Sequence, residues 1–158
     1  MNSSKTWRAV LIIFAILVVG GLFYLAFTRP RPVSHPPSPI TEVGAGAFPE
    51  QFPLDIPIEQ GAQLAKNFSV KLVDGRVQAT RGFLSKASVA SNFTFYKMYL
   101  TDPGHGWTIL GTAGDQDPSH KALFAKNANG VLTVNISRGV VPGTSFVDLS
   151  FVTARPVK

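Results

Sequence analysis

The chain of 158 residues contains no cysteine, and this absence excludes several classes of protein at once. Disulfides, thiolate metal sites, iron–sulfur clusters and cysteine nucleophiles all need a thiol, and so does the lipid anchor of a bacterial lipoprotein. Charged residues make up only 15% of the chain. The length allows one domain with appendages rather than a multidomain enzyme.

Common catalytic motifs are also missing. The sequence has no P-loop, no G-x-S-x-G nucleophile elbow and no complete calcium loop. We therefore predict a protein that is not an enzyme and that uses no cofactor or metal. One alternative stays open, in which His105, His120 and Asp117 converge as a metal-dependent or hydrolytic site. The competing interpretation is that these residues belong to loops, where Asp, Gly and Pro form turns.

One long apolar run is present near the N-terminus. Residues 9–27 are uncharged and would span about 28 Å as a helix, close to the ~30 Å hydrocarbon core of a bilayer. The basic residues that flank this run are Lys5, Arg8, Arg29 and Arg31. The pattern predicts a single-pass signal-anchor with the lipid bilayer as a partner. A cleaved signal peptide is the alternative, but its apolar core is usually about 7–15 residues long.

The orientation of this span follows from the size of its flanks. Two basic residues precede the run and two follow it, so the positive-inside rule expresses no preference. The tail of residues 1–8 is too short to form a domain. We therefore expect a cytoplasmic N-terminus and a C-terminal domain outside the cytoplasm, at the cell envelope.

Proline is abundant directly after the apolar run. Residues 28–47 contain five prolines, followed by Gly44 and Gly46. Prolines at this density favour extended polyproline II, which at ~3.1 Å per residue would reach about 60 Å from the bilayer. We interpret the segment as a stiff linker rather than as a docking motif for an aromatic groove.

A second proline pattern opens the domain of residues 48–158. Within residues 48–62, Phe48, Phe52 and Ile56 each precede a proline, which disfavours helix at those positions. Their large apolar side chains are unlike those of the linker. We predict that this segment is an extended arm that lies over the folded body.

The next segment, residues 68–84, has the pattern of a hairpin. Asp74-Gly75 is a preferred two-residue turn, and it predicts a register in which Val70 pairs with Ala79. Residues 86–100 then show helical spacing of apolar side chains, with Ser85 as the expected N-cap. The apolar stripe of this helix consists of Val89, Phe93, Tyr96 and Leu100.

The remaining sequence is rich in strand patterns. Four strands are expected at residues 107–113, 120–126, 131–138 and 145–153, with Asn129-Gly130 as a second hairpin turn. The predicted fold class is therefore α+β: an antiparallel sheet of about six strands in the order ββαββββ. One helix covers this sheet, and one transmembrane helix and a proline-rich linker precede it.

Apolar side chains also alternate onto the second face of this predicted sheet. Phe124, Phe146 and Val152 occupy that face together with polar residues. Two explanations are open: the arm covers these residues, or they form an exposed interaction face.

Three short patterns in the domain resemble a known type of protein. They are FPLDIPIEQGA at residues 52–62, FYKMYL at residues 95–100 and Gly106-Trp107. Together they resemble a domain of small uncharacterised bacterial proteins that are membrane-anchored or exported. The resemblance implies the fold and the location, and it carries over no functional residue.

The net charge of +6 suggests nucleic-acid binding at first sight. Four cations flank the apolar run, however, and the remaining 11 basic residues face nine acidic ones, so the domain carries only +2. A nucleic-acid binder concentrates its charge on the folded domain. We instead expect a non-enzymatic, membrane-anchored module that binds or assembles with an envelope protein or polymer. A structural subunit of a larger envelope complex is the alternative, and the sequence leaves the oligomeric state open.

Overall fold

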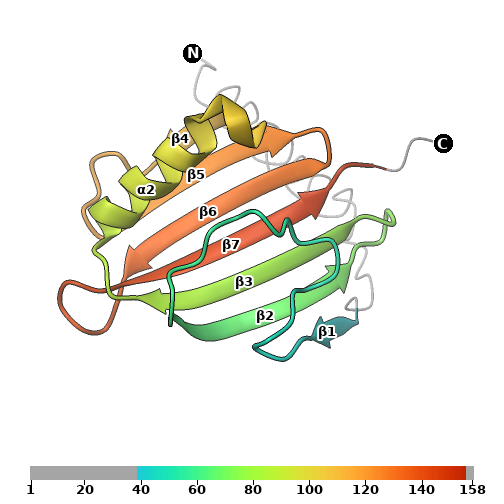
Figure 1. Cartoon of the computed structure of the whole chain (residues 1–158), viewed down its shortest axis with the longest axis horizontal. Helices are drawn as coiled ribbons and strands as arrows, with labels where there is room; N and C mark the ends of the chain where they lie inside the picture. Colours follow the sequence, from blue (N-terminus) through green and yellow to red (C-terminus); the bar gives the residue numbers. More distant parts are fainter. Residues whose placement is uncertain (1–38, 156–158) are drawn as a thin grey trace, which may run out of the picture. The chain divides into compact units, whose positions relative to one another are not determined.

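The computed structural model describes residues 39–155, which form one antiparallel sheet with a helix against it (Figure 1). The strands are β1 (Ile40–Glu42), β2 (Gln63–Lys71), β3 (Val77–Ser85), β4 (Thr108–Ala113), β5 (His120–Asn127), β6 (Gly130–Arg138) and β7 (Ser145–Thr153). Helix α2 (Val89–Thr101) and the 3₁₀ turn η1 (Pro103–His105) lie between β3 and β4. The strand order across the sheet is β1-β2-β3-β7-β6-β5-β4, which places β3 beside β7.

The predicted fold class is wrong: the strand count and order differ from the structure, and the described residues contain no transmembrane helix. The described residues form seven strands rather than six, because Ile40–Glu42 pair with β2 although we expected them in the linker. This adds a strand in front of the predicted ββαββββ order. Within residues 39–155 no helix is long and apolar enough to cross a membrane, and the predicted span at residues 9–27 lies outside the described residues.

The β2–β3 hairpin forms at the expected place, but its predicted register is wrong by one residue. The amide of Leu72 donates to the carbonyl of Arg76 at 2.7 Å, which leaves a three-residue loop. Gly75 closes this loop with a φ of 82°, a left-handed conformation that matches the twist of the flanking strands. Val70 therefore pairs with Gln78.

The β5–β6 hairpin also differs from its prediction. Its turn residues are Ala128 and Asn129, because Asn127 pairs with Gly130. The side chain of Asn127 accepts hydrogen bonds from the amides of Asn129 and Gly130 at 2.9 and 3.0 Å. Gly130 has a packing role instead, since a Cβ atom there would lie 2.7 Å from the Cζ atom of Phe151.

Helix α2 begins three residues later than predicted. Its N-cap is Ser88, whose side chain accepts a hydrogen bond from the amide of Ser91. The apolar stripe packs as expected, with Val89, Tyr96 and Leu100 buried against the sheet. The helix ends before Pro103, which opens η1.

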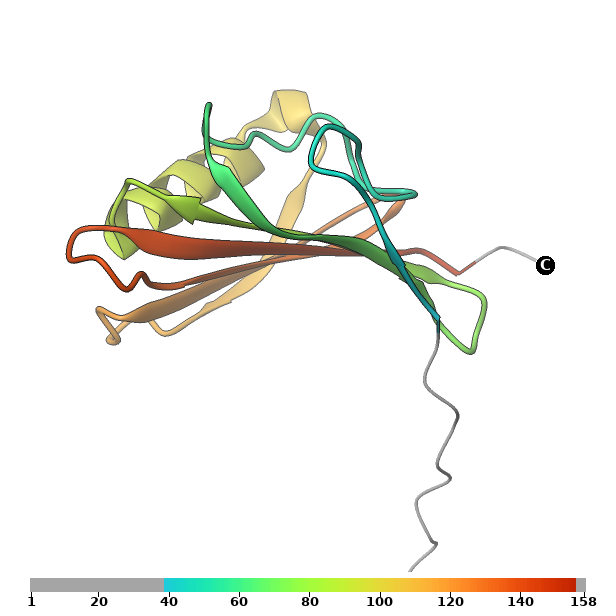
Figure 2. The ribbon, with the colours of Figure 1, turned by 90° about the horizontal axis from the view of Figure 1, so that it is seen from below.

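We call the face of the sheet that packs against α2 the covered face. Figure 2 shows that the arm, residues 48–62, lies on the same side of the sheet as α2. Phe52 and Ile56 of the arm are buried in the core, and the Tyr96 hydroxyl donates to the carbonyl of Pro57 at 2.8 Å. The strand residues of this core are Ala79, Phe83, Leu123, Ala125, Leu132, Val134, Ile136, Val147, Leu149 and Phe151. Helix and arm together therefore cover one face.

Candidate interaction face

The three residues predicted as an interaction face all lie on the side of the sheet opposite α2, which we call the open face. Each alternates with a covered-face residue on its own strand, such as Leu123 beside Phe124. Phe124 is 36% exposed, and Phe146 and Val152 are half-buried. The arm does not cover these side chains, because it packs on the covered face.

The structure does not gather these three residues into one patch. Phe146 pairs with Leu84 of β3, and Val152 pairs with Val131 of β6, so two small apolar pairs form. Phe124 lies on β5, two strands away from β7. Between these groups the sheet carries polar side chains: Thr133, Asn135, Asp148 and Ser150. The open face is thus a mixed surface with apolar groups around a polar centre.

The polar centre of the open face is organised around Asp148. Its Oδ2 atom forms an ion pair with Lys66 Nζ at 2.5 Å, and the same ammonium lies 5.3 Å from the centroid of the Phe146 ring. Gly82 allows this ring to lie against β3, since a Cβ there would be 2.8 Å from Phe146 Cζ. Asp148 Oδ1 and Thr80 Oγ1 have no hydrogen-bond partner among residues 39–155. Both atoms are buried below the surface of the open face.

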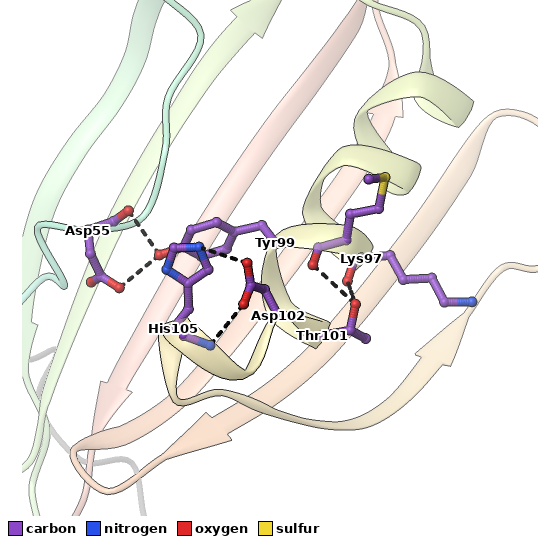
Figure 3. Close-up of polar contacts among 8 residues, drawn as sticks. Asp55, Lys97, Tyr99, Thr101, Asp102 and His105 are labelled. Atoms are coloured by element: carbon purple, nitrogen blue, oxygen red, sulfur yellow. Dashed lines mark hydrogen bonds and ion pairs between the residues drawn. The ribbon is translucent and has the colours of Figure 1, made fainter.

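His105 lies at the C-terminal end of α2 in a separate cluster (Figure 3). Its ring stacks on Tyr99 with 4.0 Å between centroids, and its Nε2 atom is 3.9 Å from Asp102 Oδ2. The Tyr99 hydroxyl donates to Asp55 Oδ2 at 2.8 Å. Burial, together with this hydrogen bond, raises the pKa of Tyr99. Because Asp55 belongs to the arm, the cluster fastens the arm to the end of the helix.

The other two residues of the predicted metal or hydrolytic site lie elsewhere. His120 begins β5, whereas His105 precedes β4, so the two histidines lie at opposite ends of this antiparallel strand pair. Asp117 accepts hydrogen bonds from the amide and hydroxyl of Ser119 at 2.7 and 2.6 Å, and these bonds lower the pKa of Asp117. Across residues 39–155, no three His, Asp or Glu side chains are grouped to hold a metal.

A buried polar network on the covered face was not anticipated from the sequence. The Ser85 hydroxyl donates to Glu59 Oε2 at 2.5 Å and accepts from the Asn92 amide at 2.8 Å. The same amide donates to the Ser145 hydroxyl at 2.8 Å, which in turn donates to the carbonyl of Ala87. Ser85 is therefore a buried link between arm, helix and sheet rather than the N-cap that we expected. A sequence signal existed, because Asn92 interrupts the apolar stripe between Val89 and Tyr96.

Arg81 is the second feature that sequence reasoning missed. It is only 6% exposed, and its guanidinium lies 4.2 Å from the ring centroid of Phe48 and 5.9 Å from that of Phe52. Its Nε atom has no hydrogen-bond partner among residues 39–155, and burial lowers the pKa of the side chain. The contact with the two rings is a cation–π interaction, which holds the start of the arm over β3.

The four cations predicted to flank a membrane span, Lys5, Arg8, Arg29 and Arg31, lie outside the described residues. Comparisons of the chain with protein-family models, with curated proteins and with solved structures each found no match.

Proposed function

We propose that this protein is a non-enzymatic binding module, held at a membrane by the uncharged residues 9–27. Its open face binds an envelope protein outside the cytoplasm. The observation that carries this proposal is the one-sided packing of the sheet: α2 and the arm both cover the same face. Phe124, Leu84 and Val131 on the other face remain substantially exposed.

The composition of the open face supports a protein partner. Non-obligate protein interfaces are only about as apolar as the rest of a protein surface, and they combine apolar contacts with hydrogen bonds. The open face offers Phe124 and the Phe146–Leu84 pair for apolar contact. The half-buried side chains of Thr133 and Asn135 can form hydrogen bonds with a partner.

A short tether makes such a module effective at modest affinity. Because β1 begins at Ile40, the tether comprises residues 28–39 rather than the predicted linker of residues 28–47. At ~3.1 Å per residue it would reach about 37 Å. A shorter tether confines the module to a smaller volume beside the membrane. This confinement raises its effective concentration for a partner in the same membrane.

Site-specific photo-crosslinking in cells that express the full chain tests this proposal. A photoreactive residue in place of Phe124 should give a discrete crosslinked product, because Phe124 lies on the open face. The matched control replaces Met98, an apolar residue of α2 that is more exposed than Phe124. Equal products from both positions, or none from Phe124, would contradict the assignment of the face.

Fractionation tests the membrane part separately. The full chain should stay in the membrane pellet after an alkaline carbonate wash, which removes peripheral proteins. Recovery of the intact chain in the soluble fraction would reject the role of residues 9–27. Purification of the crosslinked partner then separates two cases: a transient partner dissociates from the untreated protein, whereas a permanent envelope complex migrates with it.

A further inference from the structure

Both ends of the described chain leave the sheet at the β2–β3 hairpin (Figures 1 and 2). Pro39 directly precedes β1, whose first residue Ile40 pairs with Val70 near the end of β2. At the other terminus, Val152 near the end of β7 pairs with Gln78 at the start of β3. Pro39, the first described residue, therefore lies at this hairpin, next to Ile40.

Two aliphatic side chains at this end of the sheet are unusually exposed. Ile40 is 64% exposed, and Val73, the first residue of the hairpin loop, is 80% exposed. Exposed aliphatic side chains at the tip of a structure can enter the headgroup region of a bilayer, and their binding strengthens when cations lie beside them.

Three cations lie beside these aliphatic residues. Lys71 ends β2, Arg76 closes the hairpin loop, and Arg155 follows β7. The nearest acidic group is Asp74, whose Oδ2 atom lies 2.8 Å from Arg76 Nε and 4.0 Å from Arg155 Nε. Glu50 of the arm lines the same hollow as Lys71. Glu42 also lies on β1, but it pairs with Phe68, farther from the hairpin loop. At the hairpin itself the three cations face only Asp74, which favours contact with a surface of anionic lipid headgroups.

We infer that the hairpin corner, defined as Ile40, Lys71, Val73, Arg76 and Arg155, rests on the anionic surface of the membrane that holds the chain. This inference rests on the proposed function, because the tether brings the corner to the lipid. A patch this small binds vesicles weakly alone. A tether of about a dozen residues raises the local lipid concentration enough for a weak contact to be occupied.

The contact would orient the rest of the molecule. The loop between β6 and β7 lies at the opposite end of the sheet, because Arg138 pairs with Ser145 there. With the hairpin corner on the lipid, that loop points away from the membrane. The open face then stands at the side of the module, where a neighbouring membrane protein can reach it.

The absence of cysteine allows a direct test with single-cysteine variants of the full chain. Val73→Cys places an environment-sensitive fluorophore at the hairpin corner, and Ile40→Cys provides a second probe. Val140→Cys is the matched control, because Val140 is a fully exposed valine in the loop at the opposite end. The labelled chains are reconstituted into vesicles of phosphatidylcholine with or without phosphatidylglycerol.

We expect the Val73→Cys probe to show blue-shifted emission in vesicles that contain phosphatidylglycerol. Its quenching by the uncharged quencher acrylamide should be several-fold weaker than that of the Val140→Cys probe. Replacing Lys71 and Arg155 by Gln, or omitting phosphatidylglycerol, should reduce this protection. Equal quenching at the two ends, or stronger protection at Val140→Cys, would overturn the inference.

Vesicle flotation separates the two proposals. If the full chain floats with the vesicles and the probes are quenched equally, only the contact of the hairpin corner is rejected. If the chain does not float, the proposed tether fails and the corner contact, which depends on the tether, fails with it.

Discussion

The covered face and the open face consist of alternate residues of the same strands, yet they are packed in different ways. On the covered face, Leu123, Val134 and Leu149 are fully buried beneath α2 and the arm. On the open face, the neighbouring residues Phe124, Thr133 and Ser150 keep part of their surface in solvent. Among residues 39–155, helix and arm thus cover one face of the sheet only, and side chains on the second face stay partly exposed.

Truncation of one phenylalanine on each face tests this difference most strongly. Phe83→Ala should lower the free energy of unfolding by about 3–5 kcal/mol, because Phe83 is fully buried and its removal leaves a cavity. Phe124→Ala should cost about 1 kcal/mol or less, since its surface is partly in water already. Urea denaturation of both variants measures the contrast. Similar losses for the two variants would show that the open face is part of the core.

The buried polar network on the covered face should behave unlike polar residues of the open face. Asn92→Ala removes the amide that bonds to Ser85 and Ser145, so it should cost about 2 kcal/mol. Asn135 is the control, because it lies half-buried on the open face; Asn135→Ala should change stability by about 0.5 kcal/mol or less. An Asn92→Ala variant as stable as the wild type would mean that the network contributes no stability.

Loss of the hydrogen bond between Tyr99 of α2 and Asp55 of the arm should have a smaller, pH-dependent effect on stability. Tyr99→Phe removes the hydrogen bond to Asp55 and should cost about 1 kcal/mol near neutral pH. The folded state raises the pKa of Tyr99 above its unfolded value, so this contribution is complete below about pH 10 and disappears as the pH rises through the folded pKa. Thermal unfolding of both proteins at neutral and alkaline pH measures the difference. A difference that grew with pH would contradict the role of the neutral hydroxyl.

Local patterns in the sequence predicted the elements well but not the way they pair. The four strands after α2 begin and end within one residue of their predicted bounds, because apolar alternation and turn residues mark them. The hairpin register was wrong because Asp74-Gly75 serves equally in a two-residue turn and at the end of a three-residue loop. The strand β1 was missed because its residues show no apolar pattern, and its pairing with β2 is a tertiary contact.

The candidate site was predictable only in part. Alternation placed Phe124, Phe146 and Val152 on one face, but it could not show which side of the sheet the arm would cover. The side is decided by the fit of Phe52 and Ile56 beside α2 and by the cation–π contact of Arg81 with Phe48. Such contacts join residues that are distant in the sequence, and no local pattern reports them. Asp117, by contrast, forms a local contact: it accepts a hydrogen bond from Ser119 within a turn. This agrees with the interpretation of Asp117 as a loop residue rather than as a ligand.

The turn that brings the arm onto the covered face should yield the smallest effect, and in the stabilising direction. The Phe52 amide donates to the carbonyl of Pro49 at 3.1 Å, and Gln51 sits at the third position of this turn with a φ of 64°. That conformation favours glycine, so Gln51→Gly should raise stability by about 0.5 kcal/mol after the entropy that glycine gains in the unfolded chain is subtracted.

The reverse change at Gly75, which has a φ of 82°, is the matched control for Gln51→Gly: Gly75→Ala should lower stability by about 1 kcal/mol. Chemical denaturation of the two variants beside the wild type gives both values. If Gln51→Gly destabilised the protein, the Gln51 side chain itself would be holding the arm against the covered face. The cover would then depend on a specific contact of this turn in addition to the burial of Phe52 and Ile56.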